Sequence, residues 1–455
     1  MKRILFAALA LAGTACSAND TSEVVSSSDQ DLNGTLSPTG FLAKRNIGFS
    51  VETDRESETS TYYNTTGTSA SGSGAVISSA LKTLGDFRTA YGFNSAETNA
   101  KYYNRGDLGL GRDMHCIDRL SIDGQIACYV TNYAAGDGEF TFGQSRDIAF
   151  SNMDANSAAA TVAMVYRSAA AANKKIIFMV YGPNSVADPD INHTALINRA
   201  ALDRHGLNFD LEFTGNHNSS PDPITFGIPG KNFNNHIPSN CLNCHGGNYD
   251  VASHSVTGSF FLPFDLDQLE YQSASQDPRA SSTAQTAFRN LNQMVRRVAE
   301  GMPSHLSVTK QIDGWYSNPS GLDVLSGSFD AGFVPPGWRA NTDTVEVYQK
   351  VVRPSCRGCH MTLPTSTNLT FDTSSQFVPR TVALDVCSNL MPHALQTQRE
   401  FWFSAQPIAL RKYFSTLGGA GASSAVDLLD GNGGVPCGPG TISTLDPQLI
   451  GTVTQ

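Results

Sequence analysis

The pattern of apolar and polar residues in the first half of the chain predicts strands mixed with a helix. Apolar residues alternate or run together at 160–166 (ATVAMVY) and 175–182 (KIIFMVYG), as they do in buried strands. The similar endings of these two segments indicate neighbouring strands. Residues 190–206 are predicted to form a helix that ends in glycine. We therefore expect residues 40–230 to form a mixed α+β domain.

The second half of the chain shows helical periodicity. Apolar residues at 283–301 recur at intervals of three and four, and the segment ends in a glycine stop signal. Residues 341–352 carry apolar side chains spaced for one helical face, and residues 397–414 predict an aromatic-rich helix. We expect a multidomain fold in which mainly α-helical regions at 231–335 and 336–455 follow the mixed domain.

The first residues have the pattern of an export signal. A basic start, an apolar run and small residues occupy 1–16 (MKRILFAALALAGTAC), which is too short to cross a membrane. The GTAC ending resembles a lipobox and would make Cys16 a lipid-anchored first residue, and ordinary cleavage after Ala15 is the alternative. The polar residues 17–39 are typical of a flexible tether. We expect an exported protein in the periplasm or at the cell surface of a bacterium.

Composition and charge narrow the classes of partner. The chain has 455 residues, 40% hydrophobic and 16% charged, which is enough for two or three domains with apolar cores. Its formal net charge is −10, so nucleic acid and anionic membrane surfaces are poor partners. Basic or neutral redox proteins fit better, and no small-molecule substrate is indicated.

Two short motifs carry the clearest chemistry. SNCLNCHGG holds Cys241, Cys244 and His245, and SCRGCH repeats the arrangement at 356–360. A zinc site needs two cysteine pairs much closer in sequence and gives no role to the trailing histidine. A thioredoxin-like redox pair would open a helix in a βαβ pattern, whereas the residues before the first motif are typical of a loop. Covalent haem uses all three positions, because both thiols add to the porphyrin vinyl groups and the adjacent imidazole meets the iron. The sequence predicts two covalently bound haem c groups.

The remaining cysteines are consistent with an exported, oxidised protein. The chain has nine cysteines, of which four belong to the motifs. Cys116 with Cys128 could bridge two strands across a turn, and Cys387 with Cys437 could hold the C-terminal tail. That assignment leaves Cys16, the predicted lipid site.

Each predicted haem has a methionine followed by proline downstream as a candidate sixth ligand. Met391 follows the second motif, and Met302 follows the first, just past the predicted helix stop. Competing imidazoles for the same position are His236, His254, His305 and His393.

Residues 341–420 resemble a class I c-type cytochrome. The order of a preceding helix (VEVYQKVV), CRGCH, a loop carrying MPH and a closing aromatic helix is similar to that family. The resemblance implies thioether bonds at Cys356 and Cys359, with His360 as proximal ligand and Met391 as distal ligand. The short interval from His360 to Met391 departs from the longer loops of the family. Around the first motif only CLNCHGG and the later Met-Pro match, and residues 40–230 resemble no family we can name.

Two functions of different classes are compatible with these patterns. The first is electron transfer by a lipid-tethered dihaem cytochrome. The alternative is a haem enzyme similar in plan to the bacterial dihaem peroxidases, with an open sixth position on one haem. Trp315 and Trp338 lie between the motifs, where packing or electron relay are the two interpretations. A binding module at 40–230 that merely carries cytochromes is a third class.

Two further segments are weaker candidates. Residues 111–116 (GRDMHC) group Arg112, Asp113 and His115, which either form a site or belong to a structural loop supported by a disulfide. The acids of 264–270 (FDLDQLE) do not have the spacing of a calcium loop, and we expect them on a solvated edge.

Overall fold

The computed structural model describes the sheet, the motif segments and most of the C-terminal helices. The described residues are 58, 61–65, 81, 84–93, 96–106, 109–133, 146–154, 158–170, 175–182, 195–196, 237–302, 306–318, 324–362, 370–387, 395–402, 404–432 and 437. The predicted leader at 1–16, its Cys16 and the tether at 17–39 lie outside these residues.

Within the described residues, an antiparallel sheet of seven strands has the order β6-β5-β4-β3-β2-β1-β9. The strands are β1 (Thr98–Asn104), β2 (Leu110–Arg119), β3 (Gln125–Tyr133), β4 (Ala158–Arg167), β5 (Ile176–Gly182), β6 (Ala195–Leu196) and β9 (Leu269–Glu270). β4 and β5 confirm the two predicted strands, and they pair directly. The hydroxyls of Tyr62 and Tyr63 accept hydrogen bonds from the backbone N–H groups of Phe178 and Val180 on β5.

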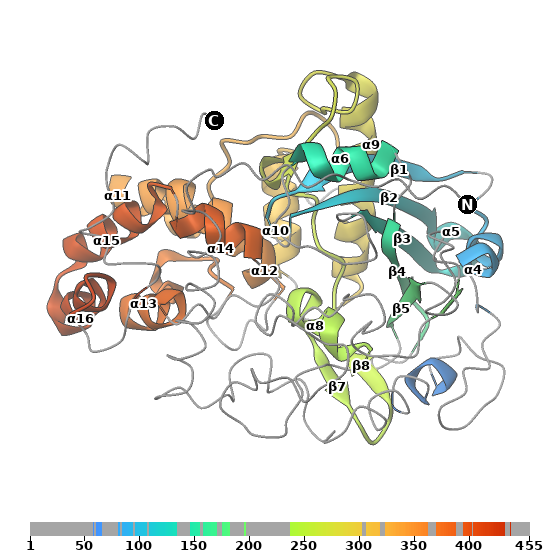
Figure 1. The fold of residues 1–455 in the computed structure, drawn as a ribbon, viewed down its shortest axis with the longest axis horizontal. Coiled ribbons are helices and arrows are strands. Elements are labelled where there is room, and N and C mark those ends of the chain that lie inside the picture. The colour runs from blue at the N-terminus through green and yellow to red at the C-terminus, as the bar shows by residue number, and fades with distance from the viewer. Residues whose placement is uncertain are drawn as a thin grey trace, which may run out of the picture.

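Helices cover both faces of this sheet (Figure 1). On one face α4 (Leu84–Tyr91) places the Phe87 ring 6.3 Å from Tyr129, and α6 (Arg146–Asp154) packs with Tyr103 and Tyr133. On the opposite face α9 (Ser282–Glu300) places the Phe288 ring 5.9 Å from Tyr102. α9 ends at its predicted glycine, and a short helix α5 (Leu120–Asp123) joins β2 to β3.

The front segment of the chain (residues 40–230) and the middle segment (residues 231–335) share one apolar core. Buried residues from Tyr62 to Met361 form a single cluster that includes the α9 face of the sheet. β9, from the middle segment, pairs with β1 from the front segment. The middle segment also contains α8 (Ser239–His245), the hairpin of β7 (Asn248–Asp250) and β8 (Ser255–Thr257), the 3-10 turn Leu266–Gln268 and α10 (Leu306–Trp315).

The C-terminal part is helical and has its own buried cluster, from Val334 to Cys437. Its elements are the 3-10 turn Pro336–Trp338, α11 (Thr342–Val347), the π-helix η5 (Tyr348–Cys356), α12 (Arg357–His360), the 3-10 turn Ser374–Gln376, α13 (Pro379–Cys387), α14 (Leu395–Trp402), α15 (Gln406–Leu417) and α16 (Gly419–Leu429). Most of them lie together at the side of the molecule away from the sheet, whereas α12 lies nearer the centre (Figure 1). The chain is therefore a mixed α+β fold with a helical C-terminal part.

Two of the predicted helices are wrong in detail. Ala195–Leu196, inside the predicted helix 190–206, is strand β6, because the edge of β5 offers backbone groups that pair with it at Tyr181 and Gly182. The predicted helix 397–414 is broken between α14 and α15. Pro407 stands in the first turn of the second helix, where proline is tolerated, because in a helix interior it lacks the N–H and its ring clashes with the preceding turn.

Candidate functional site

A cavity lies between the sheet and the two cysteine motifs. The first motif contributes Cys241, Cys244 and His245 to its lining, and the second contributes Gly358 and Cys359. The opposite wall consists of side chains from β1 to β4. Segments that are more than a hundred residues apart in sequence thus meet at one place in the fold.

The first motif forms the helix α8, so the loop-like residues before it do open a helix, contrary to the expectation from the sequence. The carbonyl of Pro238 accepts hydrogen bonds from the N–H groups of Cys241 and Leu242, which starts the helical turn. The helix ends at Gly246, whose φ of 66° lies in the left-handed region that favours glycine. Cys241 and His245, four residues apart, therefore lie on the same side of the helix.

His245 is held in the protonation state that an iron ligand needs. Its Nδ1 lies 2.7 Å from the carbonyl oxygen of Phe260, and the N–H of Phe260 donates to the carbonyl of His245. Nδ1 therefore carries the proton and donates it, which leaves Nε2 unprotonated and able to bind a metal ion. Burial lowers the pKa of His245 to about 4, against the opposing effect of the Phe260 bond, so the imidazole is neutral at pH 7.

The two motifs touch each other directly. The hydroxyl of Thr362 lies 2.7 Å from the carbonyl oxygen of Cys244 and 2.8 Å from that of Cys359. A Cβ atom on Gly246 would lie 2.1 Å from the carbonyl oxygen of Thr362. Glycine is thus required both for the backbone angle and for the close approach of the two segments.

The second motif is divided between two environments. Cys359 lines the cavity, whereas Cys356 packs against the C-terminal cluster, where burial raises the pKa of its thiol to about 12. The His360 ring stacks on Phe371, with centroids 4.0 Å apart and planes at 15°. This contact covers a face of the imidazole rather than its nitrogen-bearing edge.

A buried ion pair joins the second motif to the middle segment. Arg357, between the two motif cysteines, donates from Nε and Nη2 to the Asp265 carboxylate at 2.6 and 2.7 Å. Its Nη2 also lies 3.1 Å from a carboxylate oxygen of Asp267, and its guanidinium stacks over Trp315. The prediction that the acids of 264–270 lie on a solvated edge is wrong for Asp265, because Arg357 gives it a buried partner. The sequence gives no local signal for this pair.

Burial disfavours the charged forms in this cluster, and the neighbouring charges act on the same groups. Burial lowers the pKa of Arg357, but the charge and hydrogen bonds of Asp265 raise it, and the balance lies above the ordinary value. For Asp267, burial first and the charge of Asp265 second raise the pKa of the carboxyl, against the effect of Arg357.

Neither methionine predicted as an iron ligand is among the described residues that line the cavity. Met302 is described and buried in the shared apolar cluster, and it is not among the residues that line the cavity. Met391 lies outside the described residues, as do His236, His305 and His393. His254 forms an ion-pair contact of 2.7 Å with the carboxylate of Glu58.

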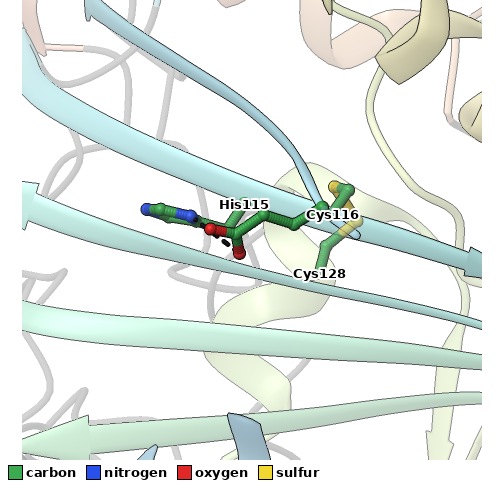
Figure 2. Close-up of a disulfide and its surroundings, with 4 residues drawn as sticks. His115, Cys116 and Cys128 are labelled. Carbon is green, nitrogen blue, oxygen red and sulfur yellow. Dashed lines mark ion pairs between the residues drawn. A yellow bond between two sulfur atoms is a disulfide. The ribbon is translucent and has the colours of Figure 1, made fainter. Parts of the chain in front are cut away.

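The candidate group at 111–116 is split by the geometry of β2. In a strand successive side chains point to opposite faces, so Arg112 faces the cavity while Asp113 and His115 face the other side. His115 lies 3.1 Å from the carboxylates of both Asp113 and Glu97. Figure 2 shows the His115 ring and the neighbouring disulfide extending in different directions from the strand. The segment is a strand, not a loop, and its three polar residues do not form one site.

Both predicted disulfides are present. Cys116 and Cys128 are opposite each other on β2 and β3, and their bridge lines the cavity. Cys387 and Cys437 join the end of α13 to the C-terminal segment. The four motif cysteines take part in neither bridge.

Sequence reasoning missed most of the cavity wall. Met114, Val130, Val162 and Met164 face the cavity from β2, β3 and β4. The alternation of these residues with those of the other face could have identified one side of the sheet. It could not show that this side packs next to the two cysteine motifs.

No known protein family, curated protein or solved structure matches this chain. The described part of the chain contains no group of three or more His, Cys, Asp or Glu side chains arranged for a metal ion. Covalent haem does not use such a group, because the porphyrin supplies four of the ligands to iron and the motif supplies one imidazole. No helix among the described residues is long and apolar enough to cross a bilayer.

The residues at the cavity fit a covalently attached haem. Two thiols and a neutral imidazole with a fixed tautomer occupy one side, and the wall of the sheet is largely apolar. A Cβ atom added to Gly358 would meet no atom within 4 Å, so there is open space beside the second motif as well. The cavity volume of about 210 Å³ is below the about 300–1,000 Å³ of typical small-molecule sites, so a porphyrin would extend into the mouth of the cavity.

Proposed function

We propose that this chain is a dihaem c-type cytochrome that transfers electrons. Cys241 and Cys244 would hold the first haem through thioether bonds, with His245 as the proximal ligand. Residues 356–360 would hold the second haem in the same way, through Cys356, Cys359 and His360. A bound haem carries one electron by changing its iron between the ferrous and ferric states.

The observation that carries this proposal is the contact between the two motifs. Thr362 bridges the carbonyls of Cys244 and Cys359, and both motifs line one cavity. The rate of electron exchange between two cofactors falls steeply with their separation. Two attachment sites in direct contact therefore favour transfer between them.

The residues around the first motif would serve the cofactor by fixing its ligand. The Phe260 carbonyl orients the His245 ring and holds the proton on Nδ1, and the buried surroundings keep the ring neutral. The apolar side chains of the sheet would exclude water from that side of the cavity and favour the less charged ferrous state.

We infer an exported location from the pattern of residues 1–16, with a lipid anchor at Cys16. The anchor would be the membrane contact of an otherwise soluble chain, on an outer membrane or in the periplasm. With a net charge of −10, the chain would exchange electrons with a basic or neutral redox protein, and electrostatic attraction would make that association sensitive to salt.

The haem content of the exported protein tests the proposal. Intact mass and the pyridine haemochrome spectrum should give two haems per chain. Replacing both cysteines of one motif with serine should leave one haem, whereas replacing Cys387 and Cys437, which lie away from the cavity, should leave two. A chain that matures in a cytochrome-producing host and still carries no covalent haem would overturn the proposal.

Carbon monoxide distinguishes the carrier from the enzyme. The polar side chains of Arg112, Asn104 and Asn132 in the cavity favour the alternative of a peroxidase-like haem enzyme, since they could orient a small ligand. A carrier with both sixth positions filled should show an unchanged ferrous spectrum when carbon monoxide is added. Rapid binding at one haem would support the enzyme instead.

A further inference from the structure

The wall of the cavity opposite the first motif presents thioether sulfur. Directly opposed residues of antiparallel strands point to the same face, which gives the sheet ordered rows of side chains. One row contains Met114, Val130 and Val162, and the next contains the Cys116–Cys128 bridge with Met164. All of these residues line the cavity. Methionine sulfur is an established axial ligand of haem iron.

Met302 is less suited to this role than its sequence position suggested. It is buried at 6% exposure within the apolar cluster, and its neighbours in that cluster include core residues of α9. It does not line the cavity in which Cys241, Cys244 and His245 meet. If His245 held a haem, a residue lining the cavity from the sheet would be placed to supply the second protein ligand.

Of the two methionines in that wall, Met114 has the better placement. Met164 pairs directly with Phe178, whose ring lies 5.4 Å from the His245 ring, so Met164 is beside the imidazole. Met114 is on β2, three strands from Phe178, or roughly 14 Å across the sheet at about 4.8 Å per strand. Met114 therefore lies farther than Met164 from the strand that contacts the imidazole, and a haem between the first motif and the sheet would leave Met114 free to bind the iron from the side away from His245.

The surroundings of Met114 agree with this placement. Its side chain is half-buried, whereas Met164 is only 8% exposed and is packed into the core. The next cavity-facing residue on the same strand, Arg112, lines the cavity together with His245. This part of β2 and the first motif therefore border the same space.

We propose that Met114 supplies the sixth ligand to the iron of the haem held by the first motif. The inference rests on the proposed function, because it requires a haem at Cys241 and Cys244. Ligation by His245 and Met114 would give a closed site that carries electrons and binds no substrate. The sheet of the front segment would then complete a haem site rather than form a separate binding module.

Conservative replacement of each methionine in the full-length protein tests the assignment. In the oxidised Met114→Leu variant, the methionine-to-iron charge-transfer band should lose the intensity that comes from the haem at the first motif. The reduction potential of that haem should fall, and its ferrous form should bind carbon monoxide. Met114→His should restore a six-coordinate spectrum that does not react with carbon monoxide, and Met164→Leu and Met302→Leu should keep the original band.

The outcomes separate this inference from the proposed function. Two haems per chain with an unchanged band in Met114→Leu would overturn the role of Met114, and so would loss of the band in Met164→Leu or Met302→Leu. Circular dichroism shows whether each variant folds, and Met114→His keeps the test valid if the leucine variant does not. Absence of covalent haem from the unmodified chain would overturn the proposed function itself and Met114 with it.

Discussion

Arg357→Ala tests how strongly the ion pair at the second motif stabilises the fold. The substitution removes a guanidinium that is 4% exposed and makes two short bonds to Asp265, which is 6% exposed. The truncated side chain would leave the Asp265 charge without its partner, away from water. Asp267, at 21% exposure, can still hydrate.

The magnitude follows from burial. Removing one member of a buried ion pair costs about 3–5 kcal/mol, because the remaining charge is left desolvated. Arg411 provides a matched control, since it binds Asp430 with two bonds of 2.6 Å but is 40% exposed. A solvent-exposed pair contributes about 0–1 kcal/mol. Arg357→Ala should therefore destabilise the protein several-fold more than Arg411→Ala.

Urea unfolding followed by far-ultraviolet circular dichroism compares the two variants. Hydrogen exchange of peptides covering 348–362 shows whether the loss is local to the second motif. The combined substitution Asp265→Leu and Arg357→Met should recover most of the stability, because an apolar pair of similar volume avoids the desolvation cost. Equal losses in Arg357→Ala and Arg411→Ala would refute the reasoning from burial.

Gly246→Ala should destabilise the fold more than Gly418→Ala, because the φ angles are 66° and 65° but only at Gly246 would the new Cβ meet a backbone oxygen; thermal unfolding that gave equal losses would contradict the clash. Burial raises the pKa of Asp385 from 3.8 to about 6, so stability is lost as the pH rises from about 4 to about 6. Asp385→Asn should match the stability of the wild type near pH 4 and be about 1–3 kcal/mol more stable at pH 7, where the range allows for the partial exposure of the carboxyl. Urea unfolding of both proteins at the two pH values checks this, and the same stability difference at both would contradict it. Replacing both cysteines of the Cys387–Cys437 bridge should lower the free energy of unfolding by about 1 kcal/mol more than replacing both cysteines of Cys116–Cys128, because the sequence separations are 50 and 12. Calorimetry of the two double variants measures both losses, and an equal or larger loss at Cys116–Cys128 would show that loop length does not control them.

Local patterns in the sequence were sufficient for several elements of the fold. Three elements carry a clear apolar periodicity of their own: the strands at 160–166 and 175–182 and the helix at 283–301. Their periodicity alone was enough to predict them. The helix predicted at 190–206 failed at Ala195–Leu196, because backbone pairing with the edge of β5 determines the conformation there and the pattern within 190–206 does not contain that information. The break near Pro407 was a local signal that the aromatic pattern around it obscured.

The site was predictable in its motifs but not in its walls. The sequence singled out two Cys-x-x-Cys-His motifs by their spacing, and residues of both line the cavity. Their role in binding haem stays a prediction. Whether Met114 or Met302 faces the first motif depends on the register of β2 and the packing of α9, which are set by long-range contacts. The pairing of Asp265 with Arg357 likewise joins positions 92 residues apart.

The second motif also determines how the two cores of the molecule are joined. Cys356 packs against the C-terminal cluster, and Met361 belongs to the cluster shared by the sheet and α9. Between them, Arg357 binds Asp265, and Thr362 lies against the carbonyl of Cys244. A displacement of the C-terminal helices relative to the sheet would have to break a buried ion pair and a close backbone contact within seven residues of chain. The separation of the two cysteine motifs is thus set by contacts within this short segment, so movement of the C-terminal helices relative to the sheet is opposed at the motifs themselves.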